Sequence, residues 1–317
     1  MGQQNPTVMI SLGGNAISPK NESGTIQQQF AHTKESLAAV MGFVKRRYNI
    51  CIAHGNGPQV GAELQRNELT QDIIPPLPLG VLVANTQGAI GYMIQQSLQN
   101  ALYKEDANRE VVSVISQVKV DKDDPELMDP KKYIGKSYDK ETAQGLSKEH
   151  SWTIKEQEPG VWRRVVPSPK PLYIFNGKSI KHLVNYGTIV IAGGGGGIPA
   201  YNDENGILHG IDGVIDKDYS AALLGRIIRA DELFMITDVD NVFLNYKQSN
   251  EKKLDKCTVS EAQEYLKQGH FGEGSMEPKI KSAIYFLDHY GTKVVLTSLN
   301  KLEDALKGNS GTTITKG

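Results

Sequence analysis

Short apolar runs, most of which stop at glycine, alternate with longer stretches of helical periodicity, and this alternation constrains the fold more than any other feature. The runs contain Val, Ile and Leu with little polar alternation, which is typical of strands covered on both faces. The strand-like runs are residues 8–12, 48–53, 188–192, 232–237 and 293–297, and the helical stretches are residues 33–47, 85–102, 219–228, 258–267 and 278–289. Strands that alternate with helices predict an α/β fold with a mainly parallel sheet and helices on both sides.

One segment, residues 121–171, departs from this alternation. It is polar, contains both tryptophans, Trp152 and Trp162, and ends in the proline-rich run 166–171. An unstructured loop of this length is uncommon inside a compact domain. We therefore expect a small protruding subdomain inserted at residues 121–171, over or beside the ligand site, within a single domain that spans residues 1–317.

Charge and composition exclude several classes of function. Lys and Arg total 35 against 36 Asp and Glu, a formal charge of -1, whereas a nucleic-acid or acidic-membrane partner requires a basic surplus or a basic face. No run approaches the ~20 apolar residues of a membrane span, and the N-terminal residues do not resemble a secretory or transit segment. We therefore expect a cytoplasmic protein. Cys51 and Cys257 lack the spacing of a structural zinc site.

Three glycine clusters follow predicted strands, namely Gly13-Gly14-Asn15, Gly55-Asn56-Gly57-Pro58 and the five consecutive glycines at 193–197. Sheets of this kind bind ligands beyond the carboxyl ends of their strands, and glycine lets backbone N–H groups approach an anion closely. Pro58 suits the first turn of a helix, whose N-terminus would favour an anion. The alternatives are a tight turn at the first cluster, plain turn chemistry at the second and a hinge at the third.

Two lysines stand at positions suited to phosphoryl transfer, which needs positive charge around the moving group more than a nucleophile on the protein. Lys217 and Lys279 lie at expected helix starts beside acidic residues, although a solvated surface charge is the alternative for each. The chain has no G-x-x-x-x-G-K-[ST] loop and no H-R-D or D-F-G set, which excludes the common P-loop and the protein kinases. Asp238 and Asp240 would bind magnesium, bind a ribose or cap a turn.

Taken in order, these motifs form a specific set that resembles the amino-acid kinase family, and within it the enzymes that phosphorylate carbamate. The matching pieces span nearly the whole chain. They are LGGNA (12–16), HGNGPQVG (54–61), TQGAIGY (86–92), WRRVVPSP (162–169), GGGGGIP (193–199), VIDKD (214–218), DVDNV (238–242) with NY (245–246), GSM (274–276) with PK (278–279), and GT (311–312).

The resemblance implies an architecture and a reaction. The architecture is a three-layer αβα sandwich around a mainly parallel sheet, with a small protruding subdomain and a homodimer as the assembly. The reaction is reversible phosphoryl transfer between ATP and carbamate, a carboxyl-group acceptor, giving ADP and carbamoyl phosphate, with a use in ATP synthesis during arginine breakdown. Mg²⁺ would be held mainly by ATP, and no protein ligand for it is predicted.

The resemblance also assigns roles to individual residues. Carbamate and the transferred phosphoryl group would be held by Gly13, Gly14, Asn15, Gly55, Asn56, Gly57, Gly193, Gly194 and Gly195. Lys217 and Lys279 would stabilise the charge in transit, and Asp218 would orient them. A further catalytic lysine on the subdomain would be Lys132, although the adjacent Lys131 fits nearly as well. The nucleotide pocket would be lined by Asp238, Val242, Tyr246 and Met276.

One departure and three alternatives stand beside this interpretation. Where the family has Gly-Pro-Phe-Tyr after the subdomain lysine, this chain has Gly135-Lys136-Ser137-Tyr138, which affects the contact made by the subdomain rather than the fold. A family member acting on glutamate, acetylglutamate, a nucleoside monophosphate or a phosphonate would need a larger pocket. A ligand sensor would lack a lysine or a glycine loop. A nicotinamide-dependent oxidoreductase would need the G-x-G-x-x-G spacing, which residues 55–61 miss by one residue.

Overall fold

The largest sheet in the described residues, 5–19, 22–272 and 275–317 of this computed structural model, has eight strands in the order β15-β17-β16-β12-β1-β2-β9-β3. Every neighbouring pair is parallel except β16 with β17. The N-terminal residues 1–4 and Gly274 of the GSM motif lie outside the described residues. The strands are β15 (Lys256–Thr258), β17 (Thr312–Thr315), β16 (Lys293–Ser298), β12 (Glu232–Thr237), β1 (Thr7–Leu12), β2 (Asn49–His54), β9 (Ile189–Ile191) and β3 (Val111–Ser113).

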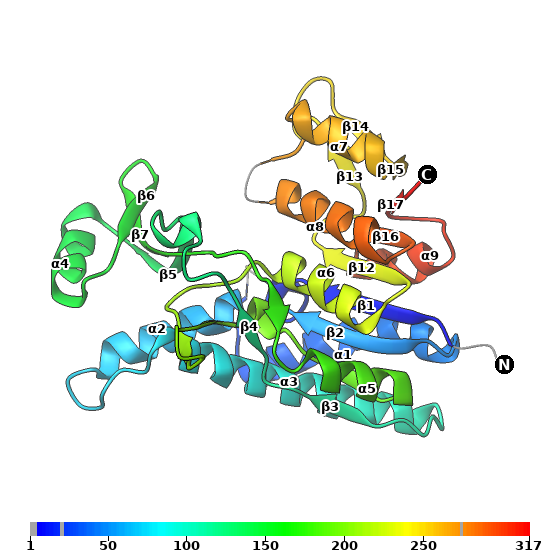
Figure 1. Cartoon of the computed structure of the whole chain (residues 1–317), viewed down its shortest axis with the longest axis horizontal. Coiled ribbons are helices and arrows are strands. Elements are labelled where there is room, and N and C mark those ends of the chain that lie inside the picture. Colours follow the sequence, from blue (N-terminus) through cyan, green and yellow to red (C-terminus); the bar gives the residue numbers. More distant parts are fainter. Residues whose placement is uncertain (1–4, 20–21, 273–274) are drawn as a thin grey trace.

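Helices cover both faces of this sheet (Figure 1). One face carries α1 (Ile26–Lys45), α3 (Leu79–Lys104) and α9 (Leu302–Leu306), and the other carries α5 (Gly177–Tyr186), α6 (Lys217–Ile228) and α8 (Met276–His289). The predicted three-layer α/β fold is therefore confirmed. None of the described helices is both long and apolar enough to cross a lipid bilayer.

The continuous apolar runs follow from this two-sided burial. Successive side chains of a strand point to opposite faces of the sheet, so Met9 packs with one hydrophobic core while Val8 and Ile10 pack with the other. Leu233 and Phe234 on β12 divide in the same way. A strand with helices on both faces has no solvent-facing positions, and polar alternation is therefore absent from these runs.

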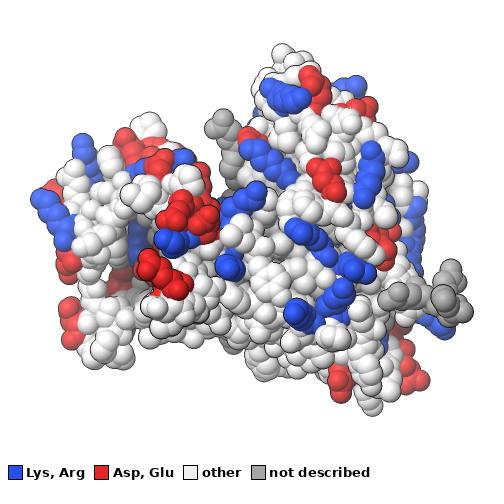
Figure 2. All heavy atoms as spheres, viewed as in Figure 1, with Lys and Arg blue, Asp and Glu red and all other residues white. Residues whose placement is uncertain are grey.

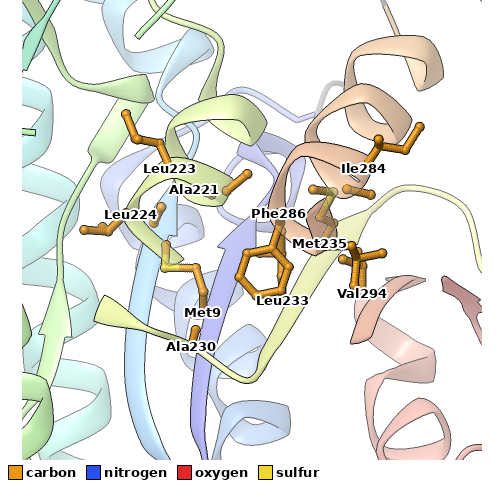
Figure 3. Packing of buried hydrophobic residues seen from close by; sticks show 14 of the residues in the cluster. Met9, Ala221, Leu223, Leu224, Ala230, Leu233, Met235, Ile284, Phe286 and Val294 are labelled. Carbon is orange, nitrogen blue, oxygen red and sulfur yellow. The ribbon is translucent and has the colours of Figure 1, made fainter. Parts of the chain in front are cut away.

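Close packing of α6 against α8 sets the position of these two helices relative to each other. A Cβ atom added at Gly225 of α6 would lie 2.8 Å from Cε2 of Phe286 on α8, so glycine allows the aromatic ring to fit against the helix. Figure 3 shows Phe286 between α8 and the strands, in the same cluster as Met9 and Leu233. Because both helices start at the carboxyl edge of the sheet, this contact positions their first turns side by side.

Residues 121–171, here called the inserted segment, form a separate lobe that Figure 1 shows on the left. Within the described chain it contains η2 (Pro125–Leu127) and α4 (Lys140–His150), together with an antiparallel sheet in the order β5-β7-β6. These strands are β5 (Lys132–Tyr138), β7 (Val161–Val166) and β6 (Ile154–Glu158). A three-stranded sheet and two helices therefore occupy the segment whose polar composition resembles a loop.

Smaller elements complete the described chain. A four-stranded sheet in the order β11-β10-β4-β8 joins the inserted segment to the main body. The remaining strands are β4 (Gln117–Lys119), β8 (Tyr173–Ile174), β10 (Ile198–Asn202), β11 (Leu208–Gly210), β13 (Val242–Leu244) and β14 (Lys252–Leu254). The remaining helices are η1 (Gly14–Ala16), α2 (Gly57–Thr70), η3 (Gly194–Gly196), α7 (Val259–Lys267) and η4 (Leu299–Lys301).

Helix boundaries differ from the predicted ones for local reasons. The helix predicted from residue 33 begins at Ile26, where Thr25 and Gln28 form a reciprocal capping box, a signal that outweighs the polar composition of the first turn. The helix predicted from residue 85 begins at Leu79, directly after Pro78. Sequence periodicity did not predict α5 or the short strands β3, β15 and β17, because short elements carry few periodic positions.

Candidate active site

A cleft of about 1090 Å³ opens at the carboxyl ends of β1, β2, β12 and β16. Its walls come from the loops after these strands, the first turns of α6 and α8, and the inserted segment. The predicted site residues that line it are Gly13, Gly14, Asn15, Gly55, Asn56, Gly57, Lys132, Gly195, Lys217, Asp218, Asp238, Tyr246, Met276 and Lys279. One space thus contains residues from seven separate parts of the chain.

The three glycine loops touch one another at the base of this cleft. A Cβ atom added at Gly55 would lie 2.6 Å from the backbone nitrogen of Gly14, and one at Gly195 would collide with the side chain of Asn56. Gly195 also has a φ of 63°, which an L side chain rarely adopts. Glycine at these positions is therefore required for the loops to approach so closely.

Backbone N–H groups from all three loops are available in the cleft. The N–H groups of Gly13 and Gly55 donate to the carbonyls of Ile236 and Leu12, at 3.0 and 2.9 Å. No acceptor is found among residues 5–19, 22–272 and 275–317 for the backbone N–H groups of Gly14, Asn15, Asn56, Gly57 and Gly195, here called the amide cradle. Converging N–H donors of this kind bind anions.

Three predicted contact residues lie behind the cleft instead of lining it. The Gly193 N–H donates to Ser116 Oγ at 2.9 Å, and Gly194 packs so tightly on the His54 ring that a Cβ atom would collide with it. Val242 is fully buried, and its N–H donates to Thr312 Oγ1 at 2.8 Å. These residues shape the walls without facing the ligand space.

Lys217, Asp218 and Lys279, here called the lysine cluster, form the charged wall of the cleft. Lys217 Nζ donates to Asp218 Oδ1 at 2.7 Å, and Lys279 Nζ donates to Asp218 Oδ2. Both ammonium groups therefore share one carboxylate. The side chain of Asp218 is 7% exposed, against 16% for Lys217 and 19% for Lys279, so the carboxylate is the buried member and the lysines face the cleft.

Burial and the charges of neighbouring groups act against each other in the lysine cluster. Burial acts to raise the pKa of Asp218, but the charges of Lys217 and Lys279 outweigh burial and hold that pKa well below its usual range. Burial lowers the pKa of Lys217. For Lys279 burial acts in the same direction, and the attraction of Asp218 overcomes it and raises the pKa. Two cations around one anion leave a net positive charge at the cleft.

The first turn of α6 is fixed by a residue that the sequence reasoning did not assign. Asp216 Oδ1 accepts from the backbone N–H groups of Asp218 and Tyr219, at 3.0 and 3.1 Å, and so caps the helix. The two residues that follow this cap are Lys217 and Asp218, so the cap places two members of the lysine cluster. A helix N-terminus also adds partial positive charge.

Lys132 reaches the cleft from the inserted segment, whereas Lys131 does not line it. Lys132 Nζ lies 3.6 Å from Asp216 Oδ2, and its side chain is 43% exposed. Lys131 instead pairs with Asp129 and Glu126, at 3.1 and 3.6 Å. The geometry thus selects Lys132 from the two adjacent candidates.

Another part of the cleft lining is apolar and aromatic. Tyr246 and Met276 belong to it, and Tyr246 is tilted against Phe243 with their ring centroids 6.0 Å apart. Asp238 also lines the cleft and accepts from Thr237 Oγ1 at 3.0 Å. An apolar surface with a carboxylate at its edge suits a base and its sugar.

The described residues contain no group of three or more His, Cys, Asp or Glu side chains that could hold a metal ion.

Ser11 is a further residue of the site that the sequence reasoning missed. It is fully buried on β1, accepts from Lys217 Nζ at 2.7 Å and donates to Asp218 Oδ1 at 2.9 Å. Its place in an apolar strand made it resemble a packing residue. A polar residue two positions before a glycine loop was the available signal.

Surface charge around the site is mixed. Figure 2 shows Lys and Arg interspersed with Asp and Glu on the visible face, including the lobe of the inserted segment. This agrees with the formal charge of -1 for the chain. The cationic character is thus local to the cleft.

Comparisons with known proteins identify relatives of nearly the whole chain. The profile of the amino acid kinase family matches residues 6–298. A carbamate kinase of Thermococcus kodakarensis is 42% identical over 312 residues, covering 98% of this chain and 99% of the relative. A carbamate kinase of Staphylococcus epidermidis is 40% identical with the same coverage.

A solved structure gives the same result in three dimensions. The carbamate kinase of Giardia lamblia bound to AMP-PNP superposes with a TM-score of 0.93 at 37% identity, and the match covers 99% of both chains. The fold, the cleft with its lysines and the extent of these similarities together show that this chain belongs to the amino acid kinase family and is a phosphotransferase.

Proposed function

We propose that this enzyme is a carbamate kinase, which moves a phosphoryl group reversibly between ATP and carbamate and produces ADP and carbamoyl phosphate. The observation that carries the proposal is the meeting of the amide cradle and the lysine cluster in one cleft. The relatives that match nearly the whole chain bear the name carbamate kinase, which supports the same substrate.

The amide cradle suits a small planar anion. Carbamate offers little apolar surface for binding, so its affinity must come from charge and from directed hydrogen bonds. Converging backbone N–H groups provide such bonds without the entropy cost of ordering side chains. The contact of Gly55 with Gly14 also brings the N–H groups of these two loops close together.

The lysine cluster suits the transfer itself. In the proposed reaction a carbamate oxygen attacks the γ-phosphorus of ATP, the bond from that phosphorus to the β–γ bridging oxygen breaks, and ADP leaves. The attacking oxygen is already anionic, so no general base is needed. Lys217 and Lys279 would offset the repulsion between two anions and the charge on the transferring oxygens, while Asp218 holds both lysines in place.

The aromatic part of the cleft would hold the nucleotide, with Tyr246 and Met276 near the base and Asp238 near the sugar. Magnesium is proposed as part of the substrate MgATP, where it neutralises phosphate charge. No step of the proposed reaction is assigned to a protein-held metal.

The direct test is ATP formation by the purified protein from ADP and carbamoyl phosphate with Mg²⁺, measured by luciferase luminescence. We expect ATP formation with carbamoyl phosphate. In the forward direction we expect ADP release with carbamate and none with glutamate, acetylglutamate or a nucleoside monophosphate. A folded protein that forms no ATP from carbamoyl phosphate, or that prefers one of the other acceptors, would contradict the proposal.

The cellular setting is part of the same proposal. We place the enzyme in the cytoplasm as a homodimer that forms ATP during arginine breakdown. Carbamoyl phosphate is a mixed anhydride, so transfer toward ADP is energetically favourable. Light scattering on the purified protein would test the dimer. Loss of arginine-dependent ATP synthesis on deletion of the gene would test the direction, and unchanged synthesis would contradict it.

A further inference from the structure

Among the residues whose backbone N–H groups form the amide cradle, Asn56 has a side chain that the rest of the protein holds in a defined orientation. It is 7% exposed and lines the cleft between Gly55 and Gly57. Its Nδ2 donates to Thr86 Oγ1 on α3 at 2.9 Å. Within the described chain no residue donates to its Oδ1. A buried amide with one end tied and the other open to a ligand cleft is poised to accept a hydrogen bond.

The hydrogen bonds of Thr86 decide which end of the amide faces the cleft. A threonine hydroxyl has a single hydrogen, and Thr86 Oγ1 donates it to the Val83 carbonyl at 2.8 Å. Towards Asn56 the hydroxyl is therefore an acceptor only, and it must face Nδ2. The carbonyl oxygen Oδ1 is left on the other side of the amide. Thr86 is 3% exposed, so water does not compete for this contact.

Carbamate needs such an acceptor. Its carboxylate end accepts hydrogen bonds, which the backbone N–H groups of the cradle supply, but its amino end can only donate them. Acetate has nearly the same shape and charge, with a methyl group in place of the amino group. A site made only of N–H donors would bind both. One acceptor beside the donors separates them, because a methyl group would leave the amide oxygen unpaired.

We infer that Asn56 Oδ1 accepts a hydrogen bond from the amino group of carbamate and of carbamoyl phosphate, and that Thr86 is the positioning residue that points this oxygen into the cleft. Asn56 is then the residue that distinguishes an amino group from a methyl group. This inference rests on the proposed function, and it assigns the specificity of that function to one pair of side chains.

The test compares carbamoyl phosphate with acetyl phosphate as phosphoryl donors to MgADP, for the wild-type enzyme, Asn56→Ala and Thr86→Val. The readout is the ratio of kcat/KM for the two donors. We expect the wild type to prefer carbamoyl phosphate. Asn56→Ala should lower kcat/KM for carbamoyl phosphate about 10- to 100-fold and that for acetyl phosphate about threefold or less. Thr86→Val should lower the ratio about 5- to 10-fold.

Thr33→Val is the matched control, since Thr33 is 1% exposed and does not line the cleft. It should leave the ratio unchanged. If acetyl phosphate turns over too slowly to measure, its inhibition constant against carbamoyl phosphate replaces its kcat/KM. Should Asn56→Ala fail to fold, Thr86→Val carries the test alone.

The outcomes separate this inference from the proposed function. A wild-type enzyme that forms no ATP from carbamoyl phosphate overturns the proposed function. An active wild type without preference, or variants that lose activity equally with both donors, overturn the inference about Asn56 and leave the proposed function standing. A collapse of the ratio in Asn56→Ala and Thr86→Val, with Thr33→Val unchanged, supports it.

Discussion

The cleft receives its lysines from two regions that hold them differently. Lys217 and Lys279 belong to the main body, are 16% and 19% exposed, and share the carboxylate of Asp218. Lys132 comes from the inserted segment, is 43% exposed, and lies 3.6 Å from Asp216. Buried charges are held by strong, weakly screened attraction, whereas exposed pairs contribute little. The main body therefore supplies fixed charge, and the inserted segment supplies charge that is free to exchange partners.

The largest effect on this comparison is expected from Lys279→Ala. Removing one charge-stabilising group typically costs ~3–4 kcal/mol, or about 10²–10³ in rate, and kcat for ATP formation should fall by that amount while the fold survives. Lys281→Ala on the same helix is the control, because Lys281 is 58% exposed and pairs with Glu277. An unchanged kcat in folded Lys279→Ala would remove the lysine cluster from the proposed mechanism.

The pH dependence of stability tests how burial changes the pKa of His54, a side chain without an ion-pair partner among the described residues. Burial lowers the pKa of His54 from 6.5 to about 4, while its Nδ1 lies 3.0 Å from the Gly55 carbonyl. The unfolded chain thus binds the extra proton between pH 6.5 and about 4, and the free energy of unfolding should fall as pH falls through that window. Between pH 7 and pH 4, denaturant titrations should show the free energy of unfolding of the wild type falling by about 3 kcal/mol more than that of His54→Gln. Parallel pH profiles for the two proteins would contradict this.

Ser11→Ala should have a smaller effect on turnover, through the buried lysine cluster. Ser11 Oγ accepts from Lys217 Nζ at 2.7 Å and donates to Asp218 Oδ1 at 2.9 Å, and so orients both groups. A hydrogen bond to a charged group contributes ~1.5 kcal/mol or more. Turnover should fall about tenfold with little change in KM, because the ammonium group loses orientation and keeps its charge. Ser11→Cys should recover part of kcat. A change in KM alone would assign Ser11 to binding instead.

The smallest effect is expected on the exposed side, from Lys132→Ala. Exposed charge contacts contribute ~1 kcal/mol or less, so kcat/KM should fall about fivefold, and the loss should shrink at high salt. Lys131→Ala is the matched control and should have no effect, since Lys131 pairs with Asp129 and Glu126 away from the cleft. A loss for Lys132→Ala as large as for Lys279→Ala would show that the inserted segment brings Lys132 onto the phosphoryl group.

Much of the fold was predictable from the chain itself. Five of the main strands and five helices were predicted from apolar runs and helical spacing, because burial on both faces leaves a strong local pattern. The five-glycine run was predicted to approach a ligand closely. Only Gly195 of its first three residues lines the cleft, since the others pack against Ser116 and His54.

The sequence alone determined the α/β class, the meeting of the glycine clusters at the carboxyl ends of the strands, and the lysines at two helix starts. The tertiary structure decided which groups act together. Ser11 and Asp218 are 207 positions apart, and Asn56 and Thr86 are 30 apart, so no local pattern reports their contact. Periodicity records whether a residue is buried, whereas a hydrogen bond between distant strands and helices depends on how the whole sheet brings them together.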